Sequence, residues 1–420
     1  MTVLPTITRP EINLSDIQGF WSRPDAEKEA AFALLRAEDP VSYHPFVNMS
    51  LVDTEGLYAV TRHEDILHVS KHPELFSSAG GITTIDAPPE FNEFFGSMIA
   101  MDDPRHARLR QLVSAGFTPR TMKRLEDAVR RIAAEIVDDV AERGECDFVT
   151  DVAAALPLRI ICDLMDVPAS QHGYVFDQTN VVLGAGDPEY TPEGTDIVTA
   201  LLTAGGNLAA LMDEVARSKE GGTGDDLTTA LINAEVDGER LTHAELASFF
   251  VLLVVAGNET TRNAISHGMM GLCANPDQRA IWAADFDGIA PTAVDEIVRW
   301  ASPVTYMRRT TAQPVTLAGA QIGAGEKVQL FYWSANRDEA VFADPYRFDV
   351  RRSPNPHVGF GGPGPHFCLG AHLARREITV MFREIFGRLG DLEMTGEPEM
   401  LLSAFIHGVK HLPCRFTPSR

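Results

Sequence analysis

The longest apolar stretch of the chain predicts a long buried helix over residues 242–275. Residues 249–256 are almost continuously apolar. Thr242 and Glu245 form a capping box at the start, and the dipeptide Asn275-Pro276 stops the helix. At 1.5 Å per residue, such a helix is roughly 50 Å long. Residues 257–261 then place a glycine and polar groups where packing alone would favour leucine or alanine, which indicates a function for this segment.

The rest of the pattern predicts a mainly α fold with small β-sheets. Helical spacing of apolar residues dominates, and strand signals are short and few. No linker, internal repeat or biased segment divides the sequence, so we expect a single domain over residues 1–420. The further helices expected are 64–71, 371–382 and a short one that starts at Pro291, and the expected strands are 57–60, 315–317 and 329–333.

Composition narrows the class of protein. With 420 residues, 45% of them hydrophobic, the chain can bury a large core. The 36 basic and 59 acidic residues give a net charge of −23, which makes nucleic acid an unlikely partner. Five scattered cysteines indicate a reducing compartment and no disulfide framework. We find no signal peptide and no run of 18 apolar residues, so we expect a cytoplasmic protein without a membrane anchor.

One cysteine stands in a chemically distinctive loop. Cys368 ends a run rich in glycine and proline that begins at Phe360, and it precedes the predicted helix 371–382. A helix N-terminus favours a thiolate. Of the ligands that proteins offer to haem iron, a thiolate favours cleavage of the O–O bond. A lone cysteine is more often a structural thiol, but the flanking glycines, Phe360 and His366 favour haem ligation by Cys368, which would be the metal ligand.

This run resembles the haem-binding loop of the cytochrome P-450 superfamily. Gly364, His366, Cys368 and Gly370 fall on its pattern. Phe360 precedes the cysteine by eight positions instead of the usual seven, which indicates a loop with one additional residue. The resemblance implies the cytochrome P-450 fold, heme b with an axial cysteine thiolate, and O2 as co-substrate. It also implies that Phe360, His366, Cys368 and Gly370 bind the cofactor.

The polar insert in the long helix matches the oxygen-activation motif of the same superfamily. Ala256 and Gly257 let the backbone approach the cofactor closely, and the resemblance makes Glu259 and Thr260 the catalytic acid and alcohol that deliver protons. A structural alternative stays open. Glu259 would then only pair with Arg262, and the Thr260 hydroxyl would bond back to a carbonyl of its own helix.

Two further residue sets take their expected roles from the resemblance. Glu296 and Arg299, at i and i+3, resemble the superfamily's Glu-x-x-Arg pair, for which Arg347 is the matching partner of the following meander. We expect these three residues to hold the cysteine loop, although such a pair is by default a screened surface salt bridge. The haem propionates need cationic or hydrogen-bonding partners, for which we expect His106, Arg110, Arg308 and His366.

Longer runs, among them 101–106, 254–263, 295–300 and 355–362, resemble the actinobacterial methyl-branched-lipid omega-hydroxylase branch and its sterol side-chain relatives. This resemblance implies a monooxygenase that hydroxylates the terminal methyl of a branched lipid, terpenoid or sterol side chain. The expected wall of the substrate pocket is apolar, although in an unknown protein these residues would be ordinary core. They are Ile82, Phe94, Met98, Val182, Val304, Met307 and Phe405.

Electrons for such a reaction would come from NAD(P)H through a ferredoxin reductase and a ferredoxin. Basic residues around Arg105 and Arg108, and His372, Arg375 and Arg376 after the cysteine, offer an acidic carrier a docking surface if the two stretches adjoin. We expect a monomer. The alternatives are a peroxide-driven peroxygenase and a haem-binding sensor without catalysis.

Overall fold

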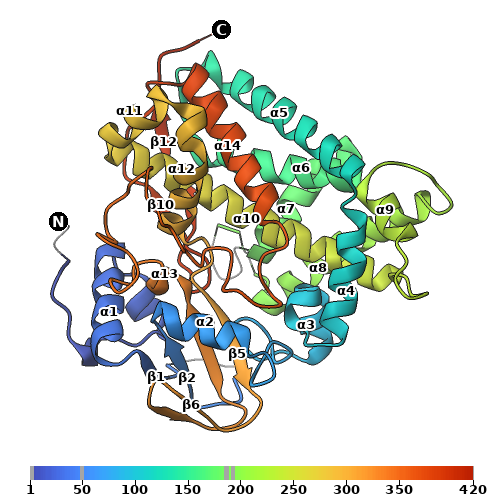
Figure 1. Cartoon of the computed structure of the whole chain (residues 1–420). Helices are drawn as coiled ribbons and strands as arrows, with labels where there is room; N and C mark the ends of the chain where they lie inside the picture. The colour runs from blue at the N-terminus through green and yellow to red at the C-terminus, as the bar shows by residue number, and fades with distance from the viewer. Residues whose placement is uncertain (1–3, 48–51, 184–188, 191–193, 420) are drawn as a thin grey trace. The chain divides into compact units, whose positions relative to one another are not determined.

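The computed structural model describes residues 4–47, 52–183, 189–190 and 194–419, which form two compact units (Figure 1). The first unit combines Met1–Asn92, His267–Ala371 and Leu402–Gly408, and the second combines Glu93–Ser266, His372–Leu401 and Val409–Arg420. Pieces of the two units alternate along the sequence, so neither unit is one continuous stretch. The single domain over residues 1–420 stays a prediction.

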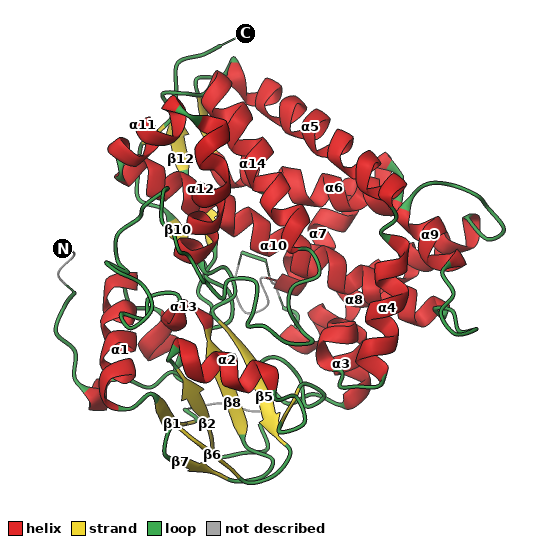
Figure 2. Cartoon of the chain, in the orientation of Figure 1, coloured by secondary structure: helices red, strands yellow, loops and turns green. Residues whose placement is uncertain are grey.

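A five-stranded sheet organises the first unit. Its order is β1-β2-β8-β5-β3, and every neighbouring pair is antiparallel except β2 and β8, where Tyr58 lies opposite Val328 in a parallel register. Figure 2 shows these strands beside one another. A two-stranded hairpin, β6-β7, completes the unit's strands. The bounds are β1 Val41–Pro45, β2 Gly56–Val60, β3 Phe76–Ser77, β5 Tyr306–Thr311, β6 Val315–Leu317, β7 Ala320–Ile322 and β8 Lys327–Phe331.

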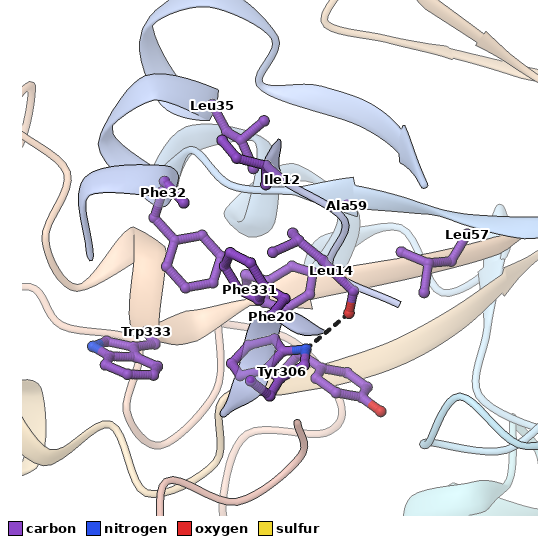
Figure 3. Packing of buried hydrophobic residues seen from close by; sticks show 12 residues of the cluster. Ile12, Leu14, Phe20, Phe32, Leu35, Leu57, Ala59, Tyr306, Phe331 and Trp333 are labelled. Atoms are coloured by element: carbon purple, nitrogen blue, oxygen red, sulfur yellow. Dashed lines mark hydrogen bonds between the residues drawn. The ribbon is translucent and has the colours of Figure 1, made fainter. Parts of the chain in front are cut away.

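An aromatic core lies against this sheet. Phe331 is fully buried and stacks on Trp21, with ring centroids 6.1 Å apart and 11° between the planes. The Trp21 Nε1–H donates to the Leu14 carbonyl at 2.9 Å, which satisfies the only polar atom of the indole (Figure 3). Each large apolar side chain buried here contributes roughly 1.5–3 kcal/mol. This cluster therefore fixes the N-terminal segment and α1 to the sheet.

The helices of the first unit correct two expected boundaries. The bounds are α1 Asp25–Glu38, α2 His63–Lys71, α11 Pro276–Ala284, α12 Phe286–Ala301 and α13 Tyr332–Ala335. The prediction that α12 starts at Pro291 is wrong, because the Asp285 carboxylate accepts from the Gly288 N–H and caps the helix earlier. The strand expected at 329–333 lies two residues earlier, at Lys327–Phe331, and its last residues belong to α13.

The second unit is mostly helical. Small sheets of order β4-β12-β9 and β10-β11 complete it. Its helices are α4 Arg105–Gly116, α5 Pro119–Ala141, α6 Ala155–Met165, α7 His172–Leu183, α8 Ile197–Ser218 and α9 Leu227–Asn233. Its strands are β4 Glu145–Asp147, β9 Glu393–Met394, β10 Glu399–Met400, β11 Val409–His411 and β12 Pro413–Arg415.

Three helices run across the boundary between the units along the chain: α3 Pro89–Gly96, α10 His243–Ala274 and α14 Ala371–Arg388. The long helix α10 confirms the prediction from the apolar run. Its capping box is present, with the Thr242 N–H donating to Glu245 Oε2 at 2.8 Å. In the described part of the chain, α10 is the single helix long and apolar enough to cross a membrane, and most of it is buried within the protein. Mainly α architecture with small sheets is therefore confirmed.

Candidate active site

The cysteine loop is closed by backbone hydrogen bonds in the first unit. The Cys368 N–H donates to the Phe360 carbonyl at 3.0 Å, and the Gly361 N–H donates to the Val358 carbonyl at 2.9 Å. Gly361 has φ +85°, which favours glycine in this turn. The thiol of Cys368 is exposed, and α14 begins three residues later at Ala371. The loop thus presents the thiol at the start of a helix, as expected.

Close contact with α2 explains the glycines of this loop. A Cβ added to Gly364, which has φ +158°, would lie 2.1 Å from the Ser70 carbonyl oxygen. A Cβ on Gly362 would lie 2.5 Å from the Ser70 hydroxyl. Only a residue without a side chain fits at either position. The two glycines on either side of Pro363 are therefore required where the loop packs on the end of α2.

Two of the expected propionate partners lie near one segment of the first unit. The His366 Nε2 and the Ser78 hydroxyl are 3.1 Å apart. A Cβ on Gly80 would lie 3.5 Å from Arg308 Nη2. Arg308 is 3% exposed, and its Nη1 bonds the Asp86 carboxylate at 2.7 Å. The buried Arg308 Nε has no hydrogen-bond partner among the described residues.

The other two expected partners share α4 in the second unit. His106 and Arg110 are one turn apart on this helix. His106 is 2% exposed, and its Nδ1 lies 3.2 Å from Asp103 Oδ1. This contact orients the ring, because it fixes one ring nitrogen against the carboxylate that precedes the helix.

In the polar segment of α10, Thr260 and Glu259 make the two contacts expected if these residues have only a structural role. The Thr260 hydroxyl donates to the Ala256 carbonyl at 2.7 Å. Glu259, 1% exposed, pairs with Arg262 and accepts from Asn263 Nδ2 at 2.8 Å. Buried charge needs such compensation, so these bonds stabilise the carboxylate in its present position.

Exposure along α10 nevertheless singles out one stripe. Between Leu246 and Met269, every residue is buried except Leu253, Val255, Ala256, Gly257 and Thr260. Spacings of three and four residues place Leu253, Ala256, Gly257 and Thr260 on one face. The hydroxyl of Thr260 therefore lies on the one accessible face of an otherwise buried helix segment.

A second acidic group near this motif was missed by sequence reasoning. Glu377 on α14 is 3% exposed and hydrogen-bonds Thr261 of α10, both in the second unit. Burial raises the pKa of Glu377 to about 8. The signal was present in the sequence, since Glu377 stands four residues after Leu373 and one before Ile378, on the apolar side of its helix.

The Glu-x-x-Arg pair is fully buried in the first unit. Glu296 and Arg299 form two parallel bonds of 2.7 and 2.8 Å, the geometry in which a guanidinium binds a carboxylate best. The second guanidinium on Glu296 comes from Arg352, whose Nε donates at 3.0 Å. The expectation for the Arg347 side chain is corrected, because this residue contributes its backbone carbonyl to Arg299 instead. The chain turns between the two arginines, and this brings Arg352 to the carboxylate.

This network reaches the cysteine loop through one asparagine. Arg299 Nη1 donates to the Asn336 carbonyl at 2.8 Å. The side chain of Asn336 accepts from the Val358 N–H at 2.8 Å. Val358 in turn accepts from Gly361 within the loop. The contacts form a continuous path from α12 to the turn that precedes Cys368.

The expected substrate residues of the first unit lie on or beside β5. The Arg308 N–H donates to the Ile82 carbonyl at 2.9 Å, and Val304 pairs with Ile406 in an isolated bridge. Phe405 meets Tyr306 edge to face at 5.4 Å. Met307, on β5 itself, is half-buried. The structure thus brings Ile82, Val304, Met307 and Phe405 to one strand and its neighbours.

Those of the second unit lie on α3, in the turn that follows α3, and on α7. A Cβ on Gly205 of α8 would lie 2.9 Å from the Phe94 ring, so α3 packs closely there. Met98 follows α3 and is 4% exposed. Val182 is half-buried on α7, which packs against α8.

Comparison with known proteins identifies the class. The sequence profile of the family "Cytochrome P450" matches residues 289–400. The chain is 50% identical over 412 residues to the methyl-branched lipid omega-hydroxylase of Mycobacterium tuberculosis, covering 96% of this chain and 95% of that protein. The chain therefore belongs to the cytochrome P450 family and is an oxidoreductase of the monooxygenase type, with heme b, a cysteine thiolate ligand and O2 as co-substrate.

Other relatives agree. The chain is 41% identical to the steroid C26-monooxygenase of Mycolicibacterium smegmatis, covering 86% of this chain and 84% of that protein. Among solved structures, a Mycobacterium marinum cytochrome P450 in complex with pseudoionone superposes with a TM-score of 0.91 at 44% identity, covering 99% of this chain and 100% of the other. The fold prediction is confirmed, and a hydrophobic substrate and a redox partner follow from the family.

The residues present fit a haem group. The first unit offers an exposed thiol at Cys368 and two groups for propionates, His366 and Arg308, the latter with a buried Nε that lacks a partner among the described residues. The second unit offers the accessible stripe on α10 that contains Gly257 and Thr260. These features match the needs of a planar group with one metal ligand and two carboxylates.

Proposed function

We propose that this chain hydroxylates the terminal methyl of a branched lipid, terpenoid or sterol side chain. The observation that carries the proposal is the 50% identity over 412 residues to a methyl-branched lipid omega-hydroxylase. Similarity to steroid C26-monooxygenases supports the same kind of position, the end of a branched chain. The apolar residues Val304, Met307 and Phe405, which are half-buried, supply a surface suited to such a chain.

We assign the ligand role to Cys368, whose Sγ would bind the iron. Gly370 lies beside it, and a Cβ there would be in ordinary van der Waals contact with that sulfur, at 3.9 Å. His366 and Arg308, together with His106 and Arg110, would bind the two propionates. Glu296 and Arg299 would hold the loop through Asn336, with the carbonyl of Arg347 accepting from Arg299.

Bound haem thiolate supplies the activation of dioxygen, and the protein supplies protons and orientation. Thr260 would hold a proton at Oγ1 on the accessible face of α10. To do so, its hydroxyl would release the Ala256 carbonyl by rotating away from it. Glu259 would take up a proton from solvent at Oε1, after exchanging one bond with Arg262 or Asn263, and would pass it to Thr260 Oγ1. In this proposal, the bonds of Thr260 to Ala256 and of Glu259 to Arg262 and Asn263 are those made before proton transfer.

A ferredoxin, reduced by an NAD(P)H-dependent reductase, would supply the electrons. Two of the three arginines of α4 pair with carboxylates, Arg105 with Glu93 and Arg108 with Glu245. The docking surface for an acidic carrier would include the basic residues at the start of α14, which are His372, Arg375 and Arg376. We further propose a monomer that works in the cytoplasm, which the scattered cysteines support.

A spectral titration tests the proposal most directly. Purified holoenzyme is titrated with branched fatty acids, isoprenoids and sterols, and products formed with ferredoxin, reductase and NADPH are located by mass spectrometry. We expect a shift of the Soret band with branched chains and oxygen at the terminal methyl. Turnover with hydrogen peroxide and none with ferredoxin would favour a peroxygenase. Binding without turnover of any lipid would favour a sensor. Cys368→Ser should lose the long-wavelength Soret band of the reduced carbon monoxide complex.

A further inference from the structure

Two cysteines face each other across the small sheet of the second unit. In the antiparallel pairing of β4 with β12, Cys146 lies directly opposite Cys414. Residues directly opposite in an antiparallel pair project to the same face of the sheet. Both carry thiols in the structure. They lie 268 positions apart in the sequence (414 − 146), so only the fold brings them together.

The backbone pattern fixes their separation. The Phe416 N–H donates to the Gly144 carbonyl and the Phe148 N–H to the Leu412 carbonyl, which makes those two pairs hydrogen-bonded pairs. Pair types alternate along the strands, so Cys146 and Cys414 also form a hydrogen-bonded pair, with Cα atoms about 5.5 Å apart. This is inside the range of about 4.4–6.8 Å that a disulfide spans.

The side chains would have to approach by about 1 Å or more. In a hydrogen-bonded pair the Cβ atoms lie at the far end of the range of about 4.5–5.5 Å, and a disulfide needs about 3.5–4.5 Å. β4 has three residues and lies at the edge of its sheet, so it can move toward β12 more easily than a central strand. A bond formed with such strain is more readily reduced, so the link would be reversible.

A third sulfur continues the row. Met394 on β9 lies opposite Cys414 on the other side of β12, so Cys146, Cys414 and Met394 stand side by side on one face. Cys146 is half-buried, whereas Cys414 is 2% exposed. An oxidant from solvent therefore reaches Cys146 first.

We propose that Cys146 and Cys414 form a reversible, peroxide-driven disulfide that fastens the C-terminal strand β12 to β4. Hydrogen peroxide oxidises the Cys146 thiol to a sulfenic acid and is itself reduced to one water. The Cys414 sulfur then attacks the Cys146 sulfur, the S–O bond breaks and a second water leaves. Two thiols and one peroxide thus give one disulfide and two waters. Such a switch does not conflict with a reducing compartment, because ambient thiols restore the dithiol.

The environment of Cys146 sets the expected rate. Burial raises the pKa of Cys146 to about 12, and Asp151 and Asp147 act in the same direction, while Arg143 opposes them. Little thiolate is present at neutral pH, so the reaction should be slow at about pH 7 and faster at about pH 9.

The test uses the intact holoenzyme. Protein is treated with hydrogen peroxide, alkylated under denaturing conditions, digested and mapped by mass spectrometry without reductant. We expect a joined peptide containing Cys146 and Cys414, loss of two titratable thiols, an upward shift of Tm, and reversal of all three by dithiothreitol. Cys146→Ser should abolish the cross-link, and the matched control Cys273→Ser should keep it.

Three results would overturn the proposal. Both thiols could remain alkylatable after peroxide treatment at about pH 9, Met394 could be oxidised to the sulfoxide while both cysteines stay reduced, or the cross-link could join other cysteines. The peptide map of the unsubstituted protein distinguishes these results from the expected cross-link. The conclusion therefore does not depend on whether a serine variant folds.

Discussion

The buried carboxyl group of Glu377 should make the stability of the protein depend on pH. Its pKa is raised by burial from 4.5 to about 8 in the folded state. Between these values the unfolded chain loses the proton while the folded protein keeps it. The contribution of this group to stability is therefore complete below about pH 4.5 and is lost as the pH rises to about 8.

The size of the effect follows from that window. Each pH unit changes the free energy of unfolding by about 1.4 kcal/mol, so the whole window of about 3.5 units costs roughly 5 kcal/mol. Glu377→Gln keeps a neutral side chain that can bond Thr261 and removes the titration. We expect the variant to match the natural protein near the acidic end of the window and to exceed its stability increasingly up to about pH 8.

Urea unfolding at several values between about pH 5 and about pH 9 measures the difference between the two proteins. That difference cancels the contributions of the other acidic groups. Glu384→Gln on the same helix is the control, because Glu384 pairs with Arg388 at a partly exposed site. A gap between Glu377→Gln and the natural protein that stays constant with pH would refute the reasoning.

Three further substitutions test the site and its support. Thr260→Ala should increase the oxygen consumed per product formed, measured as O2 uptake against hydroxylated lipid; unchanged coupling would contradict the proton-delivery role. Arg299→Met should lower the free energy of unfolding by about 3–5 kcal/mol, because it removes the two-bond partner of the buried Glu296 carboxylate and leaves Arg352 as its remaining guanidinium, whereas the exposed Arg351→Met should change it by less than about 0.5 kcal/mol in urea titrations. Gly364→Ala should weaken haem retention, since its Cβ would meet the Ser70 carbonyl. The control is Gly387→Ala in α14, where a Cβ would meet open space; it should stabilise the folded protein by about 0.5–1 kcal/mol and leave haem retention unchanged. Equal haem loss in Gly364→Ala and Gly387→Ala would argue against close packing of the loop.

Helix caps and apolar runs in the sequence predicted those helices whose ends are set by neighbouring residues. The capping box at Thr242 and the apolar run after it gave α10 almost to the residue. The prediction that α12 starts at Pro291 is wrong because proline, although favoured in the first turn of a helix, is not the start signal here: Asp285 caps the helix six positions earlier. The error concerns which of two plausible signals the helix uses.

Tertiary contacts account for what the sequence could not show. Both Arg347 and Arg352 follow the Glu-x-x-Arg pair, and only the path of the chain decides which guanidinium reaches Glu296. The pairing of Cys146 with Cys414 likewise depends on a strand register across most of the sequence. Glu377, by contrast, could have been found, because a carboxylate on an apolar helix face is a local anomaly.

The alternation of the two units along the chain bears on protein engineering. Each unit draws on three separate stretches, and α10 supplies residues to both. Exchanging one contiguous stretch with a relative would transplant part of a hydrophobic core without its complement. Chimeric enzymes built to alter substrate range should therefore swap all three stretches of a unit together, with the crossover at residues 266–267 moved to an end of α10 so that the helix stays intact.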